Sequence, residues 1–196
     1  MKSFITIIFL FAFMACNQKK KHTSLLITDD LKYSAYSWHL DDTILFYLAH
    51  YIDIDKNGHY LIMRHDTFMD KPKYFEGDIN DTLKNLINKT FVVDGNFEVD
   101  YSSKPEDNFI YDGFTYCFDY KKADSNDRKI QFIPEKSPEQ IIILSQFIDT
   151  LIYSATSRRE SFNTEDYKKE LIKFALQISE PLPKPIHANL KSDYIK

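Results

Sequence analysis

Glycine is scarce in this sequence, with only four glycines among 196 residues. Glycine-rich loops that hold phosphate groups, and backbone nests that stabilise an oxyanion, therefore have little material. The nucleophile motifs GxSxG and SxxK are also missing. These absences count against nucleotide-binding enzymes and the common serine hydrolases, and the sequence assigns no catalytic residue and no cofactor.

A disulfide framework and a basic surface are lacking as well. The only cysteines are Cys16 and Cys117, and Cys117 stands between Tyr116 and Phe118, where it is expected to be a small buried hydrophobe. The formal net charge is −4, so the chain has no basic excess for a nucleic-acid partner. Such a domain must be stabilised by its apolar core alone.

No apolar run in the sequence is long enough to span a membrane, which takes roughly 20 residues. The longest occupies residues 4–15, is broken by one threonine, and follows Lys2, which gives it the proportions of a signal peptide. It ends in residues 13–16, FMAC, which resemble a bacterial lipobox. Ala15 and Cys16 match that pattern, whereas the two residues before them depart from its bulky aliphatic and small positions.

The resemblance implies a bacterial lipoprotein with diacylglycerol on the Cys16 sulfur, held in the cell envelope by its lipid. Asn17 directly after the cysteine implies the outer membrane of a Gram-negative bacterium. The expected organisation has four parts: a signal peptide at 1–15, a lipidated cysteine and polar tether at 16–23, a single domain at 24–180, and a proline-containing tail at 181–196.

The segment from residue 51 to 64 predicts a β-hairpin. Asn57-Gly58 at its centre is the preferred pair for a two-residue type I′ turn. That register places four apolar side chains on one face in two facing pairs, Ile54 with Leu61 and Ile52 with Met63. Residues 44–50 either extend the first strand or form a helix, and the sequence leaves both open.

The remaining elements indicate the fold class. Strands are expected at 73–77, 114–120 and 129–133, and Trp38-His39 belongs to another. Three helices follow the strand pairs, so the order is strands, helix, strands, helix, helix. This order predicts an α+β fold, with an antiparallel sheet of about five strands and three helices on one face.

The helix starts carry their own signals. The first helix has Asn80 or Asp81 as its cap, and the last begins at Thr164. The strongest start is at residues 137–140, SPEQ. There Ser137 is expected to cap the helix, with proline in the first helical position and glutamine completing a capping box.

One segment resembles the opening of a calcium loop. Asp53, Asp55 and Asn57 stand at positions 1, 3 and 5, and a glycine follows at position 6. Position 12, where such a loop needs a glutamate, is Arg64, and the flanks alternate as strands. These three residues are therefore only weak metal candidates. None of the six histidines has HxH or HxxxH spacing either. The sequence accordingly assigns no metal.

Aromatic residues are abundant and offer a possible binding surface. Tyr33, Tyr36 and Trp38 cluster close to the tether. They either stack on a glycan or a protein partner, or simply pack in the core and sheet.

The leading functional hypothesis is a non-catalytic, membrane-anchored protein-interaction domain, such as an accessory subunit or an immunity-type protein. Its basis is the small size, the acidic charge, the lack of recognisable chemistry and the fixed location. A saccharide- or peptide-binding lipoprotein is the alternative, and exposed aromatic side chains in a groove favour it. A hydrolase with a dispersed site is the third hypothesis, and a cleft with histidine and carboxylates in contact favours it.

Overall fold

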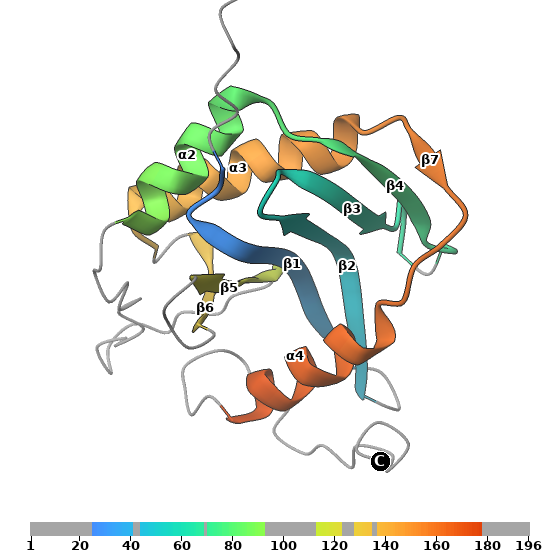
Figure 1. Cartoon of the computed structure of the whole chain (residues 1–196). Helices are drawn as coiled ribbons and strands as arrows, with labels where there is room; N and C mark the ends of the chain where they lie inside the picture. The colour runs from blue at the N-terminus through green and yellow to red at the C-terminus, as the bar shows by residue number, and fades with distance from the viewer. Residues whose placement is uncertain are drawn as a thin grey trace, which may run out of the picture.

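The computed structural model describes residues 25–40, 44–68, 70–92, 113–122, 128–134 and 137–177. These residues form one antiparallel sheet in the strand order β6-β5-β1-β2-β3-β4-β7 (Figure 1). The strands are β1 (Thr28–Leu40), β2 (Ile44–Asp55), β3 (His59–Arg64), β4 (Lys73–Asp78), β5 (Thr115–Lys122), β6 (Arg128–Phe132) and β7 (Arg158–Arg159). The helices are α2 (Asp81–Val92), α3 (Glu139–Ser154) and α4 (Glu165–Gln177). The predicted signal peptide, Cys16, the tether and the tail lie outside the described residues.

The α+β class with three helices and an antiparallel sheet is confirmed, but the sheet has seven strands rather than about five. The count of five omits β7 and also β1, of which the sequence assigned only Trp38-His39 to a strand. β1 is the central strand, and charged and hydroxyl residues separate its apolar ones, so it does not read as an apolar run. β7 has two residues, too few for any sequence pattern. Residues 44–50 belong to β2, which decides the alternative left open there.

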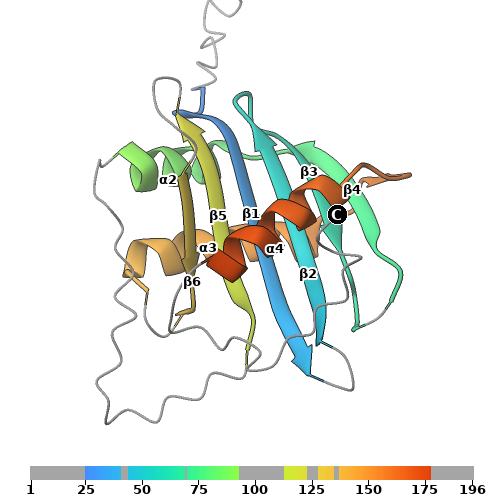
Figure 2. The ribbon, with the colours of Figure 1, turned by 90° about the horizontal axis from the view of Figure 1, so that it is seen from below.

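The helices lie on both faces of the sheet, not on one face as predicted. Figure 2 shows α4 crossing the near face, with α2 and α3 behind the sheet. On the α2 and α3 face the buried cluster includes Leu31 and Ile52, and on the α4 face it includes Leu48 and Tyr51. The central strands carry apolar side chains on both faces, and burying both faces requires helices on both.

β2 and β3 form the predicted hairpin in a different register. Ile54 lies opposite Tyr60, and Ile52 lies opposite Ile62, one residue away from the predicted pairing. A one-residue slip moves every side chain of a strand to the other face. Met63 therefore faces α4 rather than sharing a face with Ile52.

The turn chemistry explains the slip. Asp55 Oδ1 accepts hydrogen bonds of 2.9 Å from the backbone amides of Asn57 and His59, and the Gly58 amide donates to the Asp55 carbonyl at 2.8 Å. Gly58 takes a positive φ of 87°. This is a type I turn followed by a glycine bulge, with three residues between the strands instead of two.

A β-bulge on β2 sets the faces at the other end of the strand. Ala35 pairs with His50 but Tyr36 pairs with Leu48, so Ala49 is an extra residue. Beyond the bulge Leu48 joins the apolar cluster under α4, whereas His50 packs on the α3 side against Tyr33. The bulge thereby turns the start of β2 toward α4.

The helix starts agree only partly with the sequence signals. Asn80 Oδ1 accepts a hydrogen bond of 2.9 Å from the Leu83 amide, as expected of the cap of α2. Ser137 does not cap α3: its hydroxyl donates to the Ile133 carbonyl at 2.6 Å, and Pro138 is the residue preceding the helix. The capping box predicted at residues 137–140 is therefore not formed. Among the described residues, no helix has the length and apolarity needed to cross a membrane.

Candidate functional site

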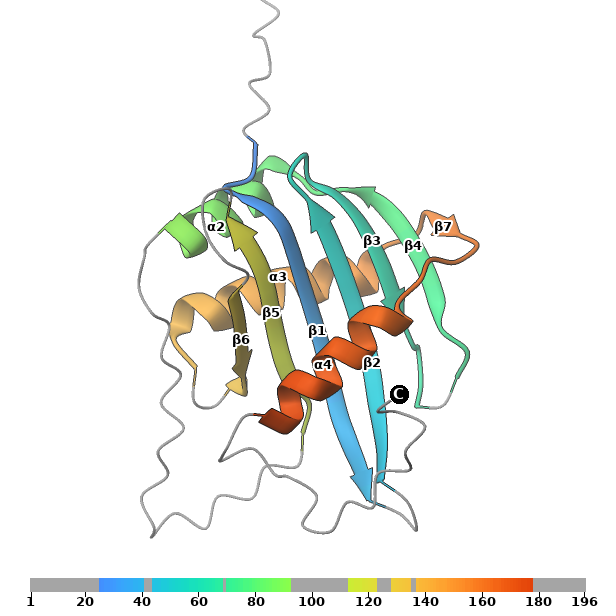
Figure 3. The ribbon, with the colours of Figure 1, turned by 60° about the horizontal axis from the view of Figure 1, so that its bottom comes forward.

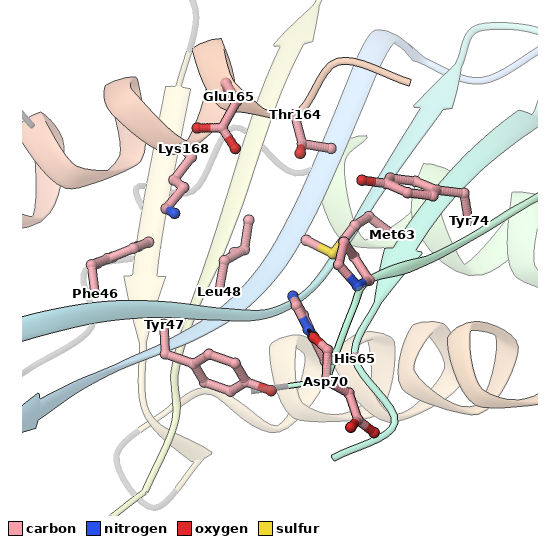
Figure 4. Close-up of a pocket in the computed structure, with 11 residues that line it drawn as sticks. Phe46, Tyr47, Leu48, Met63, His65, Asp70, Tyr74, Thr164, Glu165 and Lys168 are labelled. Atoms are coloured by element: carbon pink, nitrogen blue, oxygen red, sulfur yellow. Dashed lines mark hydrogen bonds between the residues drawn. The ribbon is translucent and has the colours of Figure 1, made fainter. Parts of the chain in front are cut away.

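A groove with a volume of about 320 Å³ lies between the start of α4 and the sheet (Figure 4). We call it the α4 groove. Its walls come from β2, β3, the segment between β3 and β4, the start of β4, and α4. Its lining residues are Phe46, Tyr47, Leu48, Met63, His65, Asp70, Pro72, Tyr74, Thr164, Glu165 and Lys168.

The floor of the α4 groove is apolar. Phe46 and Leu48 face it because the bulge at Ala49 turned them toward α4, and Met63 faces it because of the shifted hairpin register. Both irregularities act on the same spot. They bring side chains that a regular pairing would place elsewhere into one concave surface.

The helical wall of the groove is polar. Asn163 Oδ1 accepts a hydrogen bond of 3.0 Å from the Glu165 amide, and the Thr164 carbonyl accepts one of 3.0 Å from the Lys168 amide. These bonds start α4 at Glu165, one residue after the predicted start. They place Thr164, Glu165 and Lys168 along the groove.

His65 forms the opposite wall, with a fixed tautomer. Its Nδ1 lies 2.6 Å from the Asp70 carbonyl oxygen, which can only accept, so Nδ1 carries the hydrogen. The neutral ring then offers Nε2 as an acceptor to a ligand. Thr67 donates its hydroxyl to the Asp70 carboxylate at 2.6 Å, which closes this segment on itself.

Aromatic rings border the groove beside His65. The Tyr47 ring centroid lies 5.4 Å from that of His65, 4.7 Å from that of Phe68 and 6.3 Å from that of Phe114. Phe68 is 48% exposed and Phe114 is 38% exposed. Partial burial raises the pKa of Tyr47, so the phenol remains neutral at physiological pH. Because Phe68 and Phe114 are exposed, the border of the groove is an accessible aromatic surface.

The aromatic residues predicted from the sequence do not form this surface. Tyr33 is fully buried on the α3 face, and Tyr36 is buried on the opposite face, because odd and even positions of β1 point to opposite sides. Trp38 is half-buried and packs edge-on against Phe46, with ring centroids 5.0 Å apart. Tyr36 also stacks on Phe46, with ring centroids 5.1 Å apart, so Tyr36 and Trp38 both support a residue of the groove lining without lining the groove themselves.

The weak calcium candidates are occupied by interactions within the protein. Asp55 holds the turn through the two amides described above, and Asp53 accepts a hydrogen bond of 3.1 Å from the Tyr51 hydroxyl. In the described part of the chain, no group of three His, Cys, Asp or Glu side chains is placed to share a metal ion.

A second polar cluster contains a histidine and a carboxylate in contact. His50 Nε2 lies 3.1 Å from Asp149 Oδ1, its Nδ1 lies 3.3 Å from the Tyr153 hydroxyl, and Tyr33 donates to the same Asp149 oxygen at 3.0 Å. A base beside an orienting carboxylate is also found in catalytic dyads. However, the His50 side chain is only 5% exposed beneath α3 and does not line the groove. We assign this cluster to joining β1 and β2 to α3.

The other end of the α4 face carries a charged strip. Lys32 of β1 lies between Asp53 of β2 and Asp119 of β5 in the strand register. Burial, together with a hydrogen bond and repulsion from Asp30, raises the pKa of Asp53 to about 6. The folded state therefore binds a proton at Asp53 more tightly than the unfolded chain does.

This elevated pKa predicts a pH-dependent gain in stability from Asp53→Asn. A raised carboxyl pKa stabilises the fold fully below about pH 4, and that contribution is lost as the pH rises through about 6. Asp53→Asn should therefore raise the urea midpoint at pH 7.5, and the gain should shrink at pH 4.5.

Asp55→Asn is the matched control two residues away. Partial burial acts to raise the pKa of Asp55, but hydrogen bonds from the His59 and Asn57 amides hold it below its usual range. The charged form is thus the stabilising one, and Asp55→Asn should lower the midpoint at pH 7.5. Shifts of the same sign for both variants would contradict this assignment.

No protein-family model matches this chain, and no curated protein matches it significantly. The function is therefore argued from the α4 groove itself.

Proposed function

We propose that this chain is a lipoprotein of the cell envelope, anchored through Cys16, with a non-catalytic domain that binds a protein partner. Its contact site is the α4 groove, which takes an extended segment of that partner. The observation that carries the proposal is the combination of an apolar floor, a polar helical wall and an exposed aromatic border in one concave surface.

The chemistry of the groove fits a polypeptide segment. Leu48 and Met63 on the floor suit an apolar side chain, and the flexible thioether adapts to differently shaped ones. Thr164 and His65 on facing walls can bond the polar backbone of an extended chain. A saccharide ring usually stacks its apolar face on an aromatic ring, whereas Leu48 and Met63 give this floor aliphatic and thioether groups.

The position of the groove in the fold also supports the proposal. β1 follows the predicted tether and runs the length of the sheet (Figure 3), with Trp38 opposite Phe46 of the groove near its far end. Trp38 lies ten residues after Thr28 along the strand, which corresponds to roughly 33 Å. An anchor at Cys16 would thus leave the groove at the end of the sheet remote from the membrane.

Site-specific photo-crosslinking in intact cells tests the proposal. A benzoylphenylalanine at position 68, on the border of the groove, should give a covalent adduct with one protein. The control is the same residue at position 147 on α3, since Phe68 and Phe147 are both 48% exposed and lie on different faces. Position 147 should not give that adduct.

Binding strength gives the second readout. With the crosslinked partner in hand, Phe68→Ala should weaken its affinity for the full-length chain by about tenfold or more, as measured by calorimetry in lipid nanodiscs. Adducts at both positions, or at neither, would overturn the groove as the contact site. Binding of a glycan with no protein adduct would favour the saccharide alternative, in which the sugar stacks on the aromatic rings around Tyr47.

A further inference from the structure

Lys168 is the one lysine or arginine among the described residues that line the α4 groove. It is half-buried, on the first turn of α4, and its amine makes no ion pair or hydrogen bond with another described residue. Figure 4 shows the side chain turned toward Phe46 and Leu48, over the apolar floor. The ammonium group therefore lies beside an apolar surface, with no counter-charge bonded to it among the described residues.

The two carboxylates that line the groove do not neutralise this amine. The Asp70 carboxylate accepts the Thr67 hydroxyl at 2.6 Å, on the opposite wall. Glu165 lies three residues before Lys168 on the same helix, yet the two form no ion pair. Glu165 is exposed, so water screens the attraction between its carboxylate and the Lys168 amine.

We propose that the α4 groove selects a partner segment that carries an acidic side chain, whose carboxylate pairs with Lys168 Nζ. This inference rests on the proposed function, because it names the chemistry of the segment that the groove would hold. Charge complementarity carries it: a carboxylate supplies the counter-charge that the described residues do not, and the apolar floor strengthens the pair by excluding water. The segment would place an apolar side chain beside that acid, over Leu48 and Met63.

A random heptapeptide library displayed on phage provides the probe. The full-length chain in lipid nanodiscs is panned at low salt, and Asp and Glu should be enriched roughly fivefold over the input among the peptides it selects, as expected for one partly exposed ion pair. Lys168→Glu should reverse the preference, selecting Lys and Arg. Lys173→Glu, an exposed position on the same helix that does not line the groove, should leave the acidic preference unchanged.

The outcomes separate the two proposals. Enriched peptides with an apolar consensus but no acidic preference, or an acidic preference that survives Lys168→Glu, would overturn the role of Lys168 and leave the peptide groove standing. No enrichment by any of the three chains would overturn both. Reversal by Lys168→Glu together with an unchanged Lys173→Glu supports the carboxylate assignment, because loss of folding in the variant would abolish selection rather than invert it.

Discussion

Replacing Cys16 with alanine is expected to abolish metabolic labelling with palmitate and to release the protein from the membrane fraction. On the proposed lipoprotein assignment, which rests on the lipobox-like residues 13–16, the Cys16 sulfur carries diacylglycerol. Acyl chains bind a bilayer with about 0.8 kcal/mol per buried methylene, so two or three chains anchor firmly. Without them, only weak peripheral contacts with the bilayer would remain, and the fractionation result should change from pellet to supernatant.

Cys117→Ala is the matched control for this prediction, because Cys117 is the other cysteine of the chain. It is fully buried, as expected from its aromatic neighbours, and burial raises the pKa of its thiol far above the usual range. The buried thiol is therefore unreactive, and Cys117→Ala should keep both labelling and membrane association. Labelling that persists in Cys16→Ala, or disappears in Cys117→Ala, would contradict the lipoprotein proposal.

The sequence predicted a helix or strand well where a local signal, such as a single capping residue, determines where the element begins. Asn80 caps α2 as expected, and the strand between β3 and α2 was found within one residue. The hairpin shows where such reasoning stops. Asn57-Gly58 indicates a turn, but its length depends on whether Asp55 bonds the amides of the loop, and both lengths suit the same sequence. The structure has the longer loop, which reverses both faces of β3.

The α4 groove could not be predicted from the sequence because four distant segments build it. Leu48 reaches the floor only because of the bulge at Ala49, and no local sequence pattern predicts that bulge. His65 and Lys168 meet across more than a hundred residues, because α4 covers the face opposite to α3. For Tyr33 and Tyr36 the sequence left open a binding surface or packing in the core, and the sheet, with helices on both faces, buries both residues. Coverage of both faces is a property of the whole fold, which the composition of one strand does not reveal.

Gly58→Val is expected to destabilise the domain by about 2 kcal/mol or more, measured by urea unfolding. Gly58 has a φ of +87°, which a β-branched residue adopts only with strain. A Cβ at this position would also lie 2.5 Å from Lys84 Cε and 3.0 Å from Ile79 Cγ1. Either side chain would have to move. The Lys84 side chain also holds the turn to α2, because its amine donates to the Asn57 carbonyl at 2.9 Å, and the backbone amide of Ile79 donates to the Gly58 carbonyl at 2.9 Å.

The double variant Gly58→Ala with Lys84→Ala separates backbone strain from collision with Lys84. Gly58→Ala alone meets both penalties, because it places a Cβ beside the Lys84 side chain. Alanine removes the Cε and Nζ atoms of that side chain, so the double variant should be more stable than the sum of the two single effects if the collision matters. Strict additivity would leave the strained φ as the whole cause.

Millimolar calcium should leave the unfolding midpoint of the wild-type protein unchanged, because Asp55 already accepts hydrogen bonds from the turn amides and Asp53 accepts one from Tyr51. A calcium-dependent rise of several degrees would instead assign Asp53, Asp55 and Asn57 to a metal site.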